Sequence, residues 1–141
     1  MPGRLSLFAI MFGLGASALA GVLIGAVGGF VLTLLNPSGL AWLGAPGSAP
    51  PDTAAAMLFV GAVLSGSLAG GYAAARVATG DELINAFVTG VLLLALTMMS
   101  YEEPWFHQLP LWGKSIILVL SLPLSVAGGY VHRGTSRHSD A

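Results

Sequence analysis

The chain has 141 residues, of which 55% are hydrophobic and only 8% are charged. Soluble domains carry roughly 25% charged residues, so this composition excludes a water-facing surface and predicts an integral membrane protein. The formal net charge is -1 and no basic run could neutralise phosphates, which argues against nucleic acid as a partner. The absence of cysteine excludes disulfides, thiolate metal ligands and cysteine nucleophiles.

The charged residues lie at the edges of four apolar segments, which predict helices over about 5–35, 53–76, 82–101 and 110–132. Crossing a hydrocarbon core of about 30 Å takes about 20 helical residues, so each segment can span a membrane. These runs lack the alternating polarity of a membrane β-barrel. The predicted fold class is therefore all-α, a polytopic membrane protein with one four-helix bundle over residues 1–141.

The first segment also permits a second interpretation, as a secretory signal. Arg4 precedes an apolar run that reaches Ala18-Leu19-Ala20, a small-x-small cleavage pattern, and removal of residues 1–20 would leave three helices. However, residues 21–35 continue the apolar run with no polar region around that site. This continuity favours an uncleaved membrane helix.

Small residues recur at every fourth position of the first segment, and they predict a helix-packing face. The members are Gly13, Ser17, Gly21, Gly25 and Gly29. Residues at this spacing stay near one side of a helix, because each step of four residues rotates only about 40° around the helix axis. Close van der Waals contact along such a side drives helix association in lipid. We expect leucine at Gly21 or Gly25 to disrupt assembly.

Two outer loops and one tail are predicted between and after the helices. The first loop, 36–52, is rich in proline and glycine and carries Trp42 as an interfacial anchor; Asp52 is placed to cap the second helix. The second loop, 102–114, carries Trp105 and Trp112, and residues 133–141 form a cytoplasmic tail. Thr79 and Glu82 are spaced as a capping box before the third helix.

The distribution of basic residues predicts that both termini lie in the cytoplasm. With four helices, Arg4, Arg76, Arg133 and Arg137 share one side of the membrane, and Lys114 stands alone on the other. The positive-inside rule assigns the arginine-bearing side to the cytoplasm.

A short repeat links the second and fourth segments. Ser67-Leu68-Ala69-Gly70-Gly71-Tyr72 recurs as Ser125-Val126-Ala127-Gly128-Gly129-Tyr130, and an arginine follows each copy. Both copies end helices that run inwards, which predicts two parallel hairpins related by a pseudo-twofold axis; local convergence is the alternative.

Glycines of this repeat, together with Gly66, are predicted to pack helices: Gly66, Gly70, Gly71, Gly128 and Gly129. The flanking residues Tyr72, Arg76, Tyr130 and Arg133 are candidates for contact with an anionic lipid headgroup or a partner protein. Their other interpretation is structural, with tyrosine at the headgroups and arginine snorkelling outwards.

The apolar segments contain no acid, base or histidine, the groups that ion and proton pathways use at membrane depth. Asn85 is interpreted as an interhelical hydrogen-bonding residue, and Pro123 is expected to kink the last helix. Glu102, Glu103 and His107 are the one place where acids and a histidine cluster, but Pro104 disfavours helical ligand spacing there. We therefore assign no catalytic, metal-binding or cofactor-binding residues, and expect no cofactor and no enzymatic activity.

The run Gly70-Gly71-Tyr72-Ala73-Ala74-Ala75-Arg76, followed by an acidic turn and a helix beginning near Asn85-Ala86-Phe87, resembles a loose class of small four-helix bacterial inner-membrane proteins. The likeness covers about 35 residues well. It implies the topology above and the bacterial cytoplasmic membrane, and brings no catalytic residues with it.

These observations predict a structural or accessory subunit of a membrane complex or homo-oligomer, whose partners are the lipid bilayer and other membrane subunits or itself. The alternative is a small transporter or channel for a neutral or apolar solute, which would use the Pro123 kink and the glycine-lined faces. A membrane enzyme is the third possibility and would require Glu102, Glu103 or His107.

Overall fold

The computed structural model describes residues 5–37, 52–78 and 81–138, without the side chains of Tyr101, Pro104, Trp105 and residues 134–138. Every element in these ranges is helical, and four helices are long and apolar enough to cross a membrane. In chain order the elements are α1 (Leu7–Leu35), α2 (Thr53–Val77), α3 (Glu82–Met99), the 3-10 turn η2 (Ser100–Glu102), α4 (Pro104–Gln108) and α5 (Leu111–His138). The four long helices confirm the predicted all-helical membrane architecture.

The helix ends follow from local capping. Ser6 caps α1 by accepting the amide of Ala9 at 3.3 Å, so α1 begins slightly later than expected. Asp52 caps α2 as predicted, because its Oδ1 accepts the amide of Ala55 at 2.7 Å. Its Oδ2 accepts a hydrogen bond from the side-chain Nδ2 of Asn36 at 3.0 Å and so joins the end of α1 to the start of α2.

Other boundaries differ from the sequence prediction. The N-cap of α3 is Asp81 and makes no side-chain cap bond, whereas the capping box required Thr79, which lies outside the described residues together with Trp42. The predicted loop 102–114 contains η2, α4 and the first residues of α5. The predicted tail 133–141 is helical as far as His138, because a helix propagates at little cost once formed and no proline interrupts it there.

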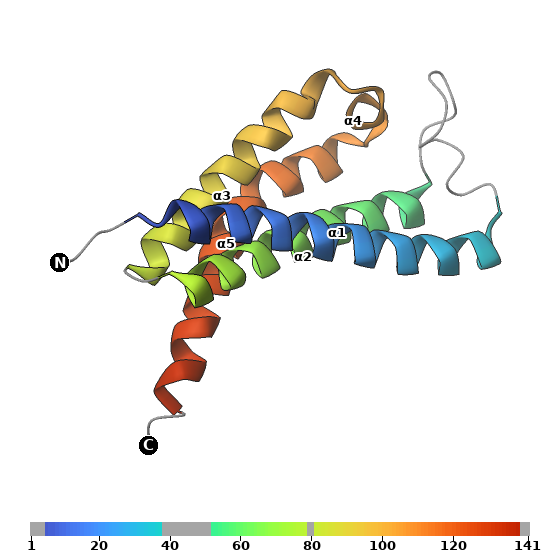
Figure 1. The fold of residues 1–141 in the computed structure, drawn as a ribbon. Helices are drawn as coiled ribbons and strands as arrows, with labels where there is room; N and C mark the ends of the chain where they lie inside the picture. Colours follow the sequence, from blue (N-terminus) through green and yellow to red (C-terminus); the bar gives the residue numbers. More distant parts are fainter. Residues whose placement is uncertain (1–4, 38–51, 79–80, 139–141) are drawn as a thin grey trace.

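The helices assemble around α2, which contacts α1, α3 and α5. Figure 1 shows α1 and α2 side by side in opposite directions, with α3 and α5 crossing them and diverging towards α4. We call the end of the bundle near Ser6, Arg76 and Asp81 the terminal end, and the end near Asn36, Asp52 and Ser100 the far end. Pro123 lies within α5, which changes direction along its length in Figure 1.

The closest backbone approaches lie at small residues near the terminal end. A Cβ added to Gly13 would lie 2.8 Å from the carbonyl oxygen of Gly70, and one added to Gly66 would lie 2.8 Å from the carbonyl of Ser17. Both distances are shorter than normal carbon–oxygen contact, so α1 and α2 can adopt this spacing only with glycine at these positions.

Further along α1 the contact with α2 loosens. A Cβ on Gly21 would lie 3.6 Å from the carbonyl of Ala62, and one on Gly25 would lie 4.0 Å from the Ala62 side chain. Among the predicted packing positions, the tightest α1–α2 contacts therefore lie at Gly13, Gly66 and Gly70, and looser ones at Gly21 and Gly25. Gly29 is buried, and a Cβ on the neighbouring Gly28 would collide with the Leu58 side chain.

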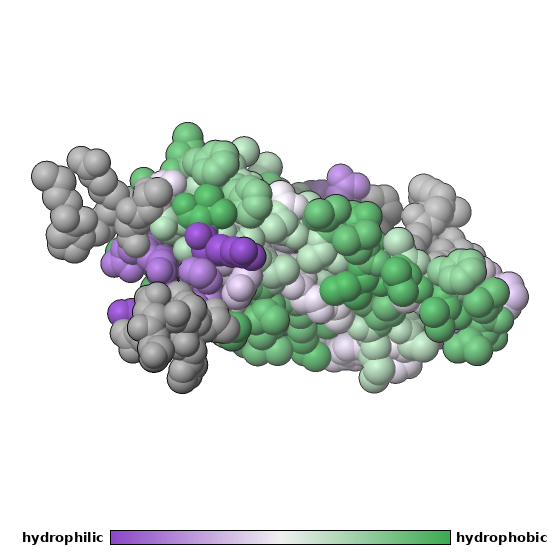
Figure 2. Space-filling view, turned by 60° about the horizontal axis from the view of Figure 1, so that its bottom comes forward, coloured by the Kyte–Doolittle hydropathy of each residue, from purple (hydrophilic) through white to green (hydrophobic). Residues whose placement is uncertain are grey.

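The exterior is mostly apolar, as a bilayer requires. Figure 2 shows hydrophilic residues gathered towards one end and hydrophobic surface over most of the rest of that face. The helix α1 contributes most to the apolar exterior, since only 6% of its membrane window is buried.

We predict that Gly70→Ala destabilises the bundle and that Gly61→Ala, on the same helix, does not. A Cβ at Gly70 would lie 2.9 Å from both the carbonyl of Gly13 and the Ser17 side chain, whereas at Gly61 it would meet nothing within 4 Å. Overpacking of this kind costs about 1–3 kcal/mol. Reversible unfolding in mixed micelles measures the difference, and equal unfolding free energies for the two variants would contradict the packing assignment.

Candidate functional site

The bundle has three candidate functional sites: the buried hydrogen-bond network at the terminal end, the junction of α2 with α5, and a groove between α1, α2 and α3. The network centres on Asn85, which is fully buried. Its Oδ1 accepts the amide of Ser6 at 2.9 Å and its Nδ2 donates to the carbonyl of Asp81 at 2.9 Å. Asn85 therefore joins the start of α1 to the start of α3, in agreement with its predicted interhelical role.

A second interhelical hydrogen bond joins α5 to α3. The buried Ser125 hydroxyl donates to the carbonyl of Ala86 at 2.8 Å. Ser121 bonds within its own helix, to the carbonyl of Ile117 at 2.6 Å. The Ser125 hydroxyl therefore fixes α5 to α3, two residues after Pro123.

The two copies of the sequence repeat lie against each other at the junction of α2 and α5. A Cβ on Gly71 would collide with the carbonyl of Ser125, and one on Gly128 would collide with the carbonyl of Leu68. Gly129 faces α3 instead, where its Cβ would lie 2.8 Å from the Ala86 side chain. The repeat glycines thus make the α2–α5 and α3–α5 crossings possible.

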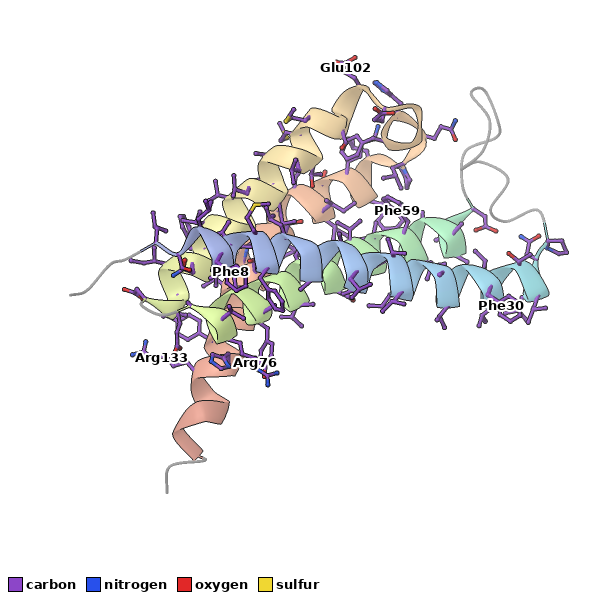
Figure 3. All side chains as sticks on the ribbon, in the orientation of Figure 1. Phe8, Phe30, Phe59, Arg76, Glu102 and Arg133 are labelled. Atoms are coloured by element: carbon purple, nitrogen blue, oxygen red, sulfur yellow. The ribbon has the colours of Figure 1, made fainter. Side chains whose placement is uncertain are left out.

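The aromatic and basic residues after the repeat lie close to this junction. Tyr72 packs edge-on against His132, with ring centroids 5.5 Å apart and planes at 89°. Figure 3 shows Arg76 and Arg133 on the same side, beside the meeting point of α2 and α5, and both are exposed. Tyr130 is 58% exposed. The structure therefore brings the two arginines to one side and pairs Tyr72 with a histidine that the sequence analysis had not selected.

An apolar groove of about 440 Å³ runs between α1, α2 and α3 towards the far end. Its floor is α2, with Phe59, Ala62 and Gly66 among the lining residues; Gly21 and Gly25 line it from α1, and Leu93 and Thr97 from α3. A smaller hollow of about 160 Å³ shares Phe59, Val63, Leu93 and Thr97 and extends it to Phe106 and Ile117. Figure 3 shows Phe59 on the side of α2 that faces α3 and α5.

Near the terminal end α1 and α3 are in contact. There Gly13 approaches the methyl group of Thr89, and Asn85 bonds to Ser6. Towards the far end a buried cluster joins α2 to α4, to its C-cap and to α5: Ala55, Val60, Phe106, Leu109 and Ile117. The sequence analysis predicted 102–114 as an outer loop with Trp105 and Trp112, and did not identify the core role of Phe106.

The far end carries the acidic residues Glu102 and Glu103 close in sequence to His107. Within the described part of the chain no group of three or more histidine, aspartate or glutamate side chains could hold an ion. Glu102, Glu103 and His107 are all exposed, and Lys114 donates to the carbonyl of His107 at 3.1 Å while lying 5.7 Å from the Phe106 ring centre. This rim therefore has the geometry of a helix connection.

Comparison of the chain with protein-family models, with curated proteins and with solved structures gave no match. The resemblance suggested by the Gly-Gly-Tyr helix end remains a prediction, and the functional argument depends on the geometry above.

We predict that Asn85→Leu lowers the unfolding free energy by about 1–3 kcal/mol, because the amide of Ser6 loses its acceptor and the α1–α3 contact loses its hydrogen bond. Thr33→Val is the matched control, since the Thr33 hydroxyl bonds only to the carbonyl of Gly29 within α1, at 2.8 Å. Unfolding in mixed micelles measures both variants. A loss as large in Thr33→Val as in Asn85→Leu would show that Asn85 has no special interhelical role.

Proposed function

We propose that the chain is a non-enzymatic accessory or structural subunit of a membrane complex or homo-oligomer. The observation that carries this proposal is the surface of α1. Large side chains stay exposed along its whole length, from Phe8 at 69% to Phe30 at 66%, and Figure 3 places these two rings near its opposite ends. A helix packed along only one side offers the remaining sides to neighbouring helices.

The distribution of contacts supports an outward role for α1 in particular. Its buried residues are few and small or near its start: Ala9, Ile10, Gly13, Ser17 and Gly29. By contrast, α2 buries residues along its full length and contacts every other long helix. In this proposal α2 holds the bundle together and α1 presents its other faces to a partner.

Two related hairpins and a cytoplasmic location of both termini belong to the same proposal. The α1–α2 and α3–α5 crossings are built alike. In each, a repeat glycine of the second helix, Gly70 of α2 or Gly129 of α5, lies against an early turn of the first helix, at Gly13 of α1 or Ala86 of α3. Arg76 and Arg133 at the terminal end favour its cytoplasmic orientation in a bacterial inner membrane. Anionic lipid headgroups near these arginines would add to that preference.

A small transporter for a neutral or apolar solute is the second candidate, and the groove of about 440 Å³ is the observation in its favour. A transport path requires water or solute access to that groove. Because the chain contains no cysteine, Gly25→Cys would create one unique reactive thiol on the groove wall.

We predict that native mass spectrometry of the chain, taken from its own membrane in mild detergent or nanodiscs, shows either a stoichiometric foreign subunit or a defined homo-oligomer. Leu23 and Phe30 are both exposed on α1, and replacing both with alanine should weaken the association constant of that assembly about tenfold. A tenfold change corresponds to about 1.4 kcal/mol of binding free energy. Val119→Ala combined with Leu120→Ala, on exposed α5, serves as the matched control.

A monomer with no co-purifying subunit would contradict the accessory role. In that case, proteoliposome flux of neutral solutes and labelling of Gly25→Cys by a membrane-impermeant maleimide become the deciding measurements. Labelling together with flux would support the transporter, and absence of both would contradict it.

A further inference from the structure

The last part of α5, from Tyr130 to His138, departs from the direction of α1 and α2. Figure 1 shows it running steeply away from these two helices, so a membrane that α1 and α2 cross has this part of α5 along its surface. We propose that this segment lies on the headgroup layer of the leaflet at the terminal end and, together with Arg76 of α2, binds anionic phospholipid headgroups. The inference rests on the part of the proposed function that puts anionic lipid near these arginines, and it requires no partner subunit.

The order of side chains along this segment fits a helix that passes from acyl chains into headgroups. Tyr130 and Val131 are its last apolar residues, and they are 58% and 55% exposed. From His132 to His138 the sequence contains no large apolar side chain, although the helix continues as far as His138. Tyrosine is typical of the headgroup level, and a polar helix end cannot stay in hydrocarbon. The segment therefore meets the headgroups directly after Val131.

The crossing of α2 and α5 places two arginines at equal distances along their helices. A Cβ on Gly71 or on Gly128 would collide with the backbone of the other helix, so the crossing lies at these two residues. Arg76 follows Gly71 by five residues and Arg133 follows Gly128 by five, which is about 7.5 Å of helix in each case. Both arginines are exposed, and Figure 3 shows them on the same side of the bundle. One layer of headgroups can therefore reach both guanidinium groups.

The start of the segment is fixed to α2. The ring of His132 packs edge-on against that of Tyr72, with the ring centroids 5.5 Å apart. A Cβ added to Gly128 would lie 2.7 Å from the backbone nitrogen of Tyr72, so the two helices are in close contact directly before the segment begins. A surface that is already held in place loses little conformational entropy when a ligand binds. This contact therefore keeps Arg133 on the side of Arg76 before any lipid binds.

The acidic residues at the terminal end do not neutralise Arg76. Asp81 and Glu82 begin α3, where the free amides of the helix N-terminus stabilise negative charge. In the part of the chain that the structure describes, neither carboxylate forms an ion pair with Arg76. Arginine donates paired hydrogen bonds to phosphate oxygens, and each arginine near an anionic bilayer surface strengthens the attraction about fivefold, or about 1 kcal/mol. Headgroups with a net negative charge, such as that of phosphatidylglycerol, suit this surface best.

The first test measures which phospholipid the full chain retains. The chain in mild detergent is mixed with equal amounts of phosphatidylglycerol and phosphatidylcholine, and native mass spectrometry counts the bound molecules of each. We expect phosphatidylglycerol to be retained in excess, and Arg76→Gln combined with Arg133→Gln to lower that excess by about fivefold or more. Lys114→Gln, which removes a basic side chain at the far end, is the matched control and should leave the excess unchanged. Equal retention of both lipids by the wild type, or an excess that survives the double substitution, would overturn the proposal.

A second measurement locates the end of α5 and does not depend on lipid retention in detergent. Because the chain has no cysteine, Thr135→Cys creates one attachment site for a fluorophore on this segment. In nanodiscs that contain phosphatidylglycerol, we expect acrylamide, a neutral water-soluble quencher, to quench this fluorophore less than in nanodiscs of phosphatidylcholine alone. A fluorophore on Glu102→Cys, exposed at the far end, is the control and should be quenched equally in both. Equal quenching at Thr135→Cys in the two bilayers would overturn the placement of the segment on anionic headgroups.

An acidic protein surface is the competing partner for the two arginines. In that case the double glutamine variant would release a subunit that co-purifies from the native membrane, and it would keep the wild-type excess of phosphatidylglycerol. That pair of results would overturn the assignment to lipid. A monomeric wild-type chain that retains phosphatidylglycerol in excess and co-purifies with no subunit would instead support the lipid site and contradict the accessory role alone.

Discussion

Close backbone contact along α2 is the constraint on which the rest of this bundle depends. In lipid there is no hydrophobic driving force between helices, so van der Waals contact and hydrogen bonds must hold them together. Glycine supplies that contact on both sides of α2, with Gly66 and Gly70 against α1 and Gly71 against the Ser125 carbonyl of α5. A Cβ at any of these positions would separate two backbones. The arrangement of α1, α3 and α5 around one central helix follows from this spacing.

The same tight contacts explain why the bundle opens elsewhere. Asn85 and Ser125 add the two interhelical hydrogen bonds near the terminal end, one to the start of α1 and one from α5 to α3. Beyond Gly70 no comparable bond joins α1 to α3 within the described residues, and the apolar groove lies between these helices. The apolar groove is thus a consequence of polar and glycine contacts concentrated at one end.

Much of the architecture could be predicted from the sequence because each signal was local. Four uncharged segments predicted four membrane helices, and Asp52 after a proline predicted a helix cap that the structure contains. Asn85 was predicted to bond between helices because a buried amide in an apolar segment needs partners, but the sequence did not indicate that one partner would be the amide of Ser6, 79 residues earlier. The glycine repeat identified close packing without saying which helices met, since both copies are compatible with several neighbours.

Sequence alone determined that this chain is a helical membrane protein, because hydropathy and segment length are properties of consecutive residues. It also determined which helices carry small-residue faces. Only the tertiary structure decided that Gly13 and Gly70, rather than Gly21 and Gly25, make the tight α1–α2 contact, and that Phe106 lies in a core instead of on the rim. The physical reason is that two helices crossing at an angle touch over a short length, and the position of that crossing depends on contacts with every other helix.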